Sequence, residues 1–219
     1  SSLLRWRYVS GYCDYYWQID DVKVVTGCRP RDGGLVAGRV LDANTRRPLA
    51  GVTVTGDGGA AATTNDDGVY VLFADKGVRM VTAIPPAGYG SAEVSVQVLS
   101  SQVARKNLAL TAGRILAGPK ALSVTVGAGS KARRVVMLRN SGTAPVSLNI
   151  DGTTSWLLLS PASGGLSVGA SKPITAVFDA RELAVGVYST SLHVRGNTPY
   201  AVLSIPVTMT VVKEAAEWR

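Results

Sequence analysis

The sequence predicts an all-β fold, in which tandem β-sandwiches follow an orphan pair of aromatic strands. Valine and alanine dominate the apolar residues, and 24 glycines and 10 prolines interrupt the chain at short intervals. Short alternating segments separated by turn residues are typical of strands joined by tight turns. A length of 219 residues favours two domains of about 80 to 110 residues each. We therefore expect almost no helix.

The composition narrows the class of protein. Hydrophobic residues make up 46% of the chain and charged residues 17%, which is typical of a globular protein. The longest apolar runs fall short of the ~20 residues that a membrane-spanning helix needs. A net charge of +8 favours anionic partners such as cell-surface polymer, phospholipid or nucleic acid. The basic residues are scattered, however, so solvated strand faces are the simpler interpretation of most of them.

Aromatic residues crowd residues 4–26. The alternation predicts two strands, and a change of parity at Asp20 and Asp21 indicates a bulge or a strand covered on both faces. Because an isolated hairpin is marginal in water, we expect this pair to contact upstream polypeptide, another domain or another copy of the chain. The residues of this partner or ligand interface are Trp6, Tyr8, Tyr12, Tyr15, Tyr16 and Trp17. A platform for sugar rings is the alternative, since the spacing does not distinguish the two.

The two cysteines, Cys13 and Cys28, both lie near this segment. A local disulfide between them would indicate an oxidising, extracellular compartment, and two buried free thiols are the alternative. No charged leader followed by an apolar core opens the sequence at Ser1, so we expect a processed chain or a fragment.

Residues 33–113 are predicted to form the first sandwich. The segments GRVLDANTRRPLAGVTV, TTNDDGVYVL and AIPPAGY resemble the carboxypeptidase regulatory-like domain, which is a transthyretin-like β-sandwich. Gly68 can take a positive φ after Asp66 and Asp67, whose side chains are expected to bond their own backbone, so that Tyr70 and Leu72 face one side of the next strand. Pro48 turns the chain so that residues 52–54 return to the sheet.

Residues 114–213 are predicted to form a second sandwich, followed by a tail over residues 214–219. The segments LSVTVGAGSKARRVVMLRNSGTAPVSLNI and FDARELAVGVYSTSLHVRGNTP resemble the immunoglobulin-like repeats found beside bacterial secreted enzymes. We expect Trp156 and Leu158 to anchor its core, and residues 140–142 to make a tight turn.

In residues 1–32, the run WQIDDVKV resembles the last strand of a jelly-roll domain. In this order the three parts resemble the C-terminal accessory region of subtilisin-like serine peptidases that bacteria secrete. The resemblance implies an extracellular location and an upstream catalytic domain as partner. In similar jelly-roll domains the Asp pair of the last strand can belong to a structural calcium site, which makes Asp20 and Asp21 candidate calcium ligands. An ordinary turn or edge position is the alternative for both.

The residues that catalysis would need are missing from this sequence. A serine peptidase requires a base beside its nucleophile, and the only histidine, His193, alternates with Leu192 and Val194 as a strand residue does. One histidine and two separated cysteines also cannot supply a zinc site. Asp66 and Asp67 fit a turn better than a calcium site. We expect no cofactor other than the calcium proposed above.

Three functions are consistent with these observations. The first is a non-catalytic extracellular accessory or attachment region of a secreted bacterial protease or surface protein. The second is a structural subunit of a filament or oligomer, assembled by strand donation from residues 4–26. The third is a carbohydrate-binding or adhesive module. Nucleic acid is disfavoured as a partner, because the basic and aromatic residues lie mostly in different places, and the glycines of residues 56–59 lack the helix and lysine of a phosphate loop.

Overall fold

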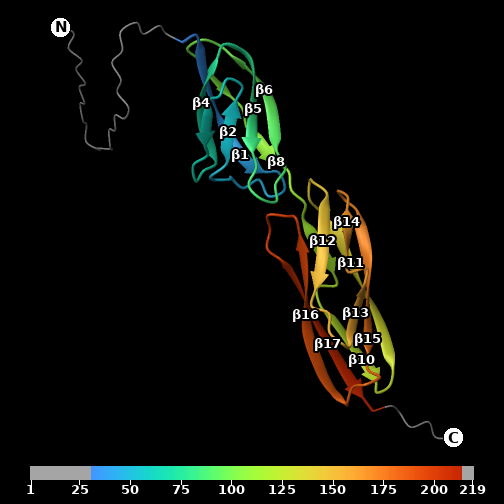
Figure 1. The fold of residues 1–219 in the computed structure, drawn as a ribbon. Coiled ribbons are helices and arrows are strands. Elements are labelled where there is room, and N and C mark those ends of the chain that lie inside the picture. Colours follow the sequence, from blue (N-terminus) through green and yellow to red (C-terminus); the bar gives the residue numbers. More distant parts are fainter. Residues whose placement is uncertain (1–30, 214–219) are drawn as a thin grey trace, which may run out of the picture. The chain divides into compact units, whose positions relative to one another are not determined.

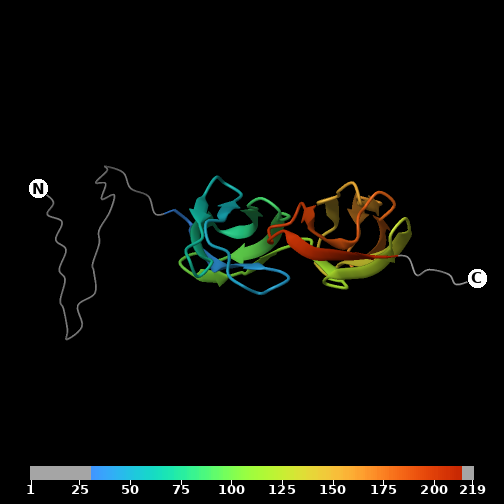
Figure 2. The same ribbon diagram turned by 90° about the horizontal axis from the view of Figure 1, so that it is seen from below.

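The structure is a computed structural model that describes residues 31–213, so that residues 1–30 and 214–219 lie outside the described residues. Between residues 31 and 213 it contains seventeen β-strands and no helix, which confirms the predicted all-β fold. The strands build two sandwiches, β1–β8 and β9–β17, and each sandwich has two sheets (Figures 1 and 2). Within these residues no helix could therefore cross a membrane.

The first sandwich is organised around β1 (Gly33–Asp42). This strand pairs antiparallel with β4 (Val69–Asp75) on one side and parallel with β7 (Val103–Arg105) and then β8 (Leu108–Leu110) on the other. The facing sheet has the order β3 (Ala61–Thr63), β2 (Thr53–Gly56), β5 (Gly77–Ile84) and β6 (Ala92–Val98). β1 is therefore the central strand of its sheet.

The core of the first sandwich comes from the alternation that the sequence shows. In β4, Tyr70 and Leu72 are buried while Val71 between them is exposed, as expected for a strand with one face against a core. Val54, which belongs to the facing sheet, and Val52, the residue before its strand β2, are also buried in the core. This confirms the predicted return of the chain to the sheet after Pro48. The two sheets thus share one continuous apolar cluster.

In the turn before β4, Gly68 takes the predicted conformation, but the side chain that bonds the backbone is that of Asn65 and not those of Asp66 and Asp67. Gly68 has a φ of +69°, and the side-chain oxygen of Asn65 accepts hydrogen bonds from the backbone N–H groups of Asp67 and Val69 at 3.1 and 2.8 Å. Glycine adopts this left-handed conformation without the penalty that a β-carbon brings. Asp66 and Asp67 are exposed residues of this turn.

The second sandwich combines a five-stranded and a four-stranded sheet. The first follows the order β10 (Leu122–Gly127), β17 (Leu203–Val212), β16 (Gly186–Gly196), β12 (Val146–Asp151) and β14 (Ser163–Leu166). The second follows the order β13 (Leu157–Ser160), β15 (Ser171–Asp179), β11 (Lys131–Asn140) and β9 (Ile115–Gly118). Their inward side chains form a second apolar cluster with no member in common with the first.

Asn140 closes the predicted turn at the end of β11 from a buried position. Its side-chain oxygen accepts hydrogen bonds from the backbone N–H groups of Gly142 and Arg114, and its amide group donates to the carbonyl oxygens of Ala144 and Leu166. These four bonds use both lone pairs of the amide oxygen and both N–H groups of the amide nitrogen. The turn over residues 140–142 is therefore confirmed.

The prediction that Leu158 anchors the core of the second sandwich was wrong. Trp156 is buried and stacks near Phe178, with ring centroids 6.3 Å apart, but Leu158 is 53% exposed and Leu157 is fully buried instead. The prediction placed residues 156 and 158 on one face of a strand. Trp156 belongs to the turn that precedes β13, so the alternation begins at Leu157, which pairs with Phe178.

The predicted domain boundaries at residues 32, 113 and 213 stay predictions. The described residues from Asp32 onward belong to one compact unit. The break between β8 and β9, from residue 111 to residue 114, separates the strands of the two sandwiches.

Candidate functional site

The site residues predicted from the sequence lie outside the described residues. They are the aromatic interface of Trp6, Tyr8, Tyr12, Tyr15, Tyr16 and Trp17, the cysteines Cys13 and Cys28, and the candidate calcium ligands Asp20 and Asp21. The strand pair, the disulfide and the calcium site therefore stay predictions. The sites described below belong to residues 31–213.

His193 lies on the outer face of β16. Its register partners are Ser204 in β17 and Asp151 in β12, so a serine, a histidine and an aspartate share one row across the sheet. Asp151, however, is engaged by Arg195, whose Nε lies 2.9 Å from its Oδ2. Among the described residues no hydrogen bond joins His193 to either register partner, and a carboxylate held by arginine does not orient an imidazole.

A strand break beside β1 forms the first candidate site. β1 pairs with β7 as far as Arg105 and resumes with β8 at Leu108, which leaves Lys106 and Asn107 between the two strands. The Lys106 N–H donates to the carbonyl of Ala37 at 2.9 Å. The side-chain oxygen of Asn107 accepts the N–H of Arg39 at 2.9 Å, so a side chain replaces a backbone partner at the break.

The carbonyl oxygen of Lys106 forms its hydrogen bond with Tyr70. The Tyr70 hydroxyl donates a 2.7 Å hydrogen bond to this oxygen from the sandwich interior, and burial raises the pKa of Tyr70 to about 12. Gly38 makes room for the same carbonyl, because a β-carbon at residue 38 would lie 1.6 Å from it. The break is thus specified by three residues on three different strands or connections.

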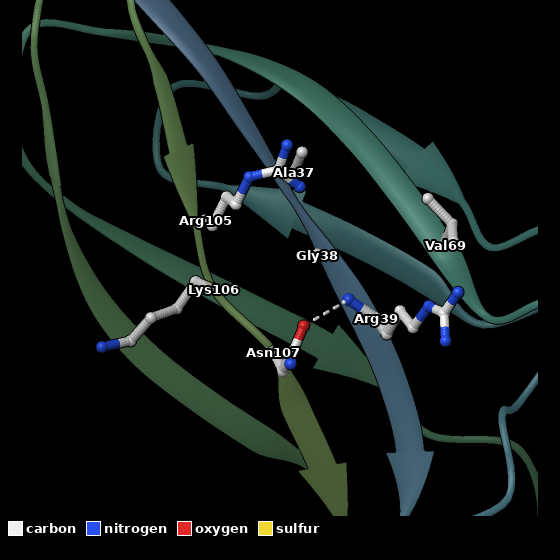
Figure 3. A pocket seen from close by; sticks show the side chains of 7 residues that line it. All are labelled: Ala37, Gly38, Arg39, Val69, Arg105, Lys106 and Asn107. Carbon is white, nitrogen blue, oxygen red and sulfur yellow. Dashed lines mark hydrogen bonds between the residues drawn. The ribbon is translucent and has the colours of Figure 1, made fainter.

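A groove of about 560 Å³ opens over this break (Figure 3). Figure 3 shows the guanidinium groups of Arg39 and Arg105 on either side of Gly38, with the Lys106 side chain directed away from it. Ala37, Gly38 and Val69 supply small or apolar walls. Since the Asn107 oxygen already accepts the Arg39 N–H, its amide group is left as a donor.

The groove carries positive charge that no acidic side chain neutralises in the part of the chain that the structure describes. The ion pairs found there join Lys76 to Asp32, Lys131 and Arg181 to Asp179, and Arg195 to Asp151. None of them includes Arg39, Arg105 or Lys106. Every polar side-chain group free to contact a ligand in the groove is therefore a hydrogen-bond donor, which suits an oxyanion.

The second candidate site is a buried junction at the end of β1. Asp42 is 2% exposed, and its carboxylate accepts hydrogen bonds from the backbone N–H groups of Asn44 and Thr45 and from the hydroxyls of Tyr89 and Tyr200. The Tyr200 hydroxyl lies 2.8 Å from Oδ2 and 3.0 Å from Oδ1. Asp42 belongs to the first sandwich and Tyr200 to the second, so this carboxylate joins the two.

The electrostatics of the junction favour an ionised Asp42. Burial by itself opposes ionisation, but the Tyr200 hydroxyl and the N–H groups of Asn44 and Thr45 outweigh it and hold the pKa of Asp42 below its ordinary value. Burial, followed by the hydrogen bond to Asp42, raises the pKa of Tyr89. The junction therefore needs a charged carboxylate and neutral phenols at the same time.

Further contacts reinforce the junction around Tyr200. Asn44 donates from its amide group to the Tyr200 hydroxyl and to the carbonyl of Ala112, both at 2.8 Å. The guanidinium carbon of Arg114 lies 5.9 Å from the centroid of the Tyr200 ring, within the range of a cation–π contact. A β-carbon on Gly88 would lie 2.5 Å from the backbone nitrogen of Pro199, so the loops approach each other closely.

Similarity of this chain to known proteins is limited to solved structures. The sequence matches no family model and no curated protein. It is similar to a PapD-like domain of human CEP192, with 17% identity and a TM-score of 0.42 over 46% of this chain and 87% of that one. It is also similar to BcpA, the major pilin subunit of Bacillus cereus, with 10% identity and a TM-score of 0.39 over 83% of this chain and 69% of that one.

A third similar structure is a DUF3823 family protein from Parabacteroides merdae, with 15% identity and a TM-score of 0.35 over 81% of this chain and all (100%) of that one. Similarities at these identities say nothing of what this chain binds. None of them connects it with subtilisin-like peptidases, so the resemblance to accessory regions of those enzymes stays a prediction.

Sequence reasoning missed both described sites. Arg39 and Arg105 are far apart in the chain, and the basic clusters that stand out in the sequence are Arg46 with Arg47 and Lys131 with Arg133 and Arg134. Lys131 pairs with Asp179 at 2.9 Å, so part of the more prominent cluster is neutralised. The one usable signal was Gly38 within a strand, because an isolated strand glycine indicates a bulge or close backbone approach.

Proposed function

We propose that this chain is a non-catalytic structural module of an extracellular protein, in which coupled sandwiches hold attached partners at a defined separation. This is the accessory or attachment role that the sequence resemblance implies. The observation that supports it is the Asp42 junction, where one buried carboxylate binds side chains from both sandwiches. A module that only tethered its partners would need no such network.

The junction makes separation of the sandwiches costly. A hydrogen bond to a charged group contributes about 1.5 to 3 kcal/mol, and leaving a buried charged group without its partners costs more. Pulling Tyr200 away from Asp42 would remove one such bond and also the bond from Asn44 to the Tyr200 hydroxyl. The two sandwiches are therefore expected to resist load and to unfold together.

Calorimetry of the full 219-residue chain tests this coupling. We expect one transition in the wild type, with a van't Hoff enthalpy close to the calorimetric enthalpy of the whole chain. Tyr200→Phe keeps the ring but removes the hydroxyl, and should split or broaden that transition. Tyr188→Phe is the matched control, because its hydroxyl binds the carbonyl of Ala184 within the second sandwich.

Two results would contradict the proposal. One is a wild-type chain that already unfolds in two independent transitions, and the other is a Tyr200→Phe variant whose transition keeps the shape of the Tyr188→Phe transition. The partner in the longer protein is a separate matter. We propose an upstream catalytic domain, and the genomic sequence before Ser1 checks this, since an upstream stretch with no catalytic domain would rule it out.

Assembly with other copies is the alternative partnership. Strand donation from residues 4–26 would produce polymers, which light scattering of the purified chain detects. A chain that stays monomeric at high concentration would exclude this alternative and leave the coupled module as the structural role.

A further inference from the structure

We propose that the groove beside β1 is a binding site for an acidic polysaccharide, whose carboxylate or sulfate groups are bound by Arg39 and Arg105. This inference concerns a different surface from the Asp42 junction and does not depend on the coupling of the two sandwiches. It rests on the charge of the groove, on the geometry of its floor and on the residues that border it.

The arrangement of the two arginines follows from the register of β1. Arg105 pairs with Ala37, and Arg39 lies two residues further along the same face of β1, paired with Val69. Diagonal neighbours of this kind have β-carbons about 7 Å apart in a sheet. Two guanidinium groups at that spacing can each bind an oxyanion at the same time. The site therefore favours a ligand that carries repeated negative charges.

The floor keeps the arginines accessible. Between them on this face lies Ala37, whose methyl group is too small to cover the neighbouring backbone. Gly38 has the opposite parity to Ala37 and Arg39, and its missing side chain leaves room for the Lys106 carbonyl at the strand break. The Asn107 amide group adds a neutral donor, held in orientation by the Arg39 N–H.

The border of the groove favours a sugar chain over other polyanions. Val71 and Val103 are 51% and 54% exposed, and they lie on the same outer face beside Ala37 and Leu35. Such side chains can pack against the C–H faces of sugar rings. No aromatic residue lines the groove, so a ligand is bound here through its anionic groups and not by ring stacking, which disfavours single-stranded nucleic acid.

Binding of the full chain to defined polymers tests the proposal. The probes are polygalacturonate for carboxylate, dextran sulfate for sulfate and neutral dextran as the blank. We expect both anionic polymers to bind and neutral dextran not to bind. Arg39→Gln with Arg105→Gln should weaken binding at least about tenfold, on the scale of losing charge-assisted hydrogen bonds, and should lower the slope of log K against log salt concentration by about 2.

Arg133→Gln with Arg139→Gln is the matched control. These arginines also alternate on the outer face of a sheet, and their replacement removes the same net charge from a surface away from the groove. Retained binding in this control together with loss in the groove variant supports the site. Equal losses in both variants would show attraction by net charge alone and overturn the proposal.

Two further probes separate the sugar from other anions. A single-stranded oligothymidylate and phosphatidylserine vesicles should bind more weakly than the acidic polysaccharides, and their binding should respond equally to the groove and control variants. Stronger binding of either probe that depends on Arg39 and Arg105 would overturn the assignment to polysaccharide. Failure of all anionic polymers to bind would overturn the site itself, while the calorimetric test of the junction would stand unaffected.

Discussion

The hydroxyl of Tyr70 donates a 2.7 Å hydrogen bond to the carbonyl oxygen of Lys106. The bond runs from a fully packed core position, with 1% of Tyr70 exposed, to the strand break that shapes the groove. The interior of the first sandwich and its outer surface are thus connected through one polar contact. A change at Tyr70 should therefore alter the strand break under the groove as well as the stability of the core.

Tyr70→Phe should destabilise the chain by about 1 to 3 kcal/mol, because it leaves the Lys106 carbonyl without its buried donor. Urea denaturation measures the change as a lower midpoint. Tyr188→Phe, whose hydroxyl is exposed, should lose far less. If the two variants were equally stable, the Lys106 carbonyl would have to find water or another donor.

Gly38→Ala should be more damaging than Tyr70→Phe, since the added β-carbon would lie 1.6 Å from the Lys106 oxygen and the strands would have to separate. We expect a loss of several kcal/mol, or failure to fold at all, judged by the yield of folded protein and by denaturation. Gly186→Ala is the control, because the nearest atom to its β-carbon would be a side-chain carbon at 3.8 Å. A stable Gly38→Ala variant would show that the break rearranges freely.

High pH should destabilise the fold through its buried phenols. Burial raises the pKa of Tyr70 from 10.0 to about 12, so the folded state keeps the neutral phenol where the unfolded chain would already lose its proton. The stabilisation is complete below about pH 10 and is lost as the pH rises through 12. Denaturation midpoints measured across this range should fall, and they should fall less steeply in Tyr70→Phe. A slope unchanged by that substitution would assign the loss to other groups.

Leu157→Ala and Leu158→Ala should differ sharply although the residues are adjacent. Leu157 is fully buried beside Phe178, whereas Leu158 is 53% exposed. Truncating a buried leucine typically costs about 2 to 5 kcal/mol, and a surface change usually stays within about 0.5 kcal/mol. Equal losses measured by urea denaturation would mean that the outer face of β13 is covered by something else.

Much of the fold was predictable because alternation and turn chemistry act locally. Tyr70 and Leu72 alternate with exposed residues, and the turn at residues 65–68 depends on a glycine and on a side chain that bonds its own backbone. Leu158 shows the limit of this reasoning. A shift of one residue in where a strand begins reverses which side chains face the core, and the turn that holds Trp156 sets that point.

The sequence by itself determined the class of this protein: an all-β chain whose alternating segments and turn residues build sandwiches. It also singled out the aromatic residues 4–26, which no described part of the structure tests. Only the tertiary structure decided that Arg39 and Arg105 share one groove, and that Asp42 meets Tyr200. The physical reason is that both pairs depend on strand register and loop approach across long separations in the chain, and alternation carries no information about which strands become neighbours.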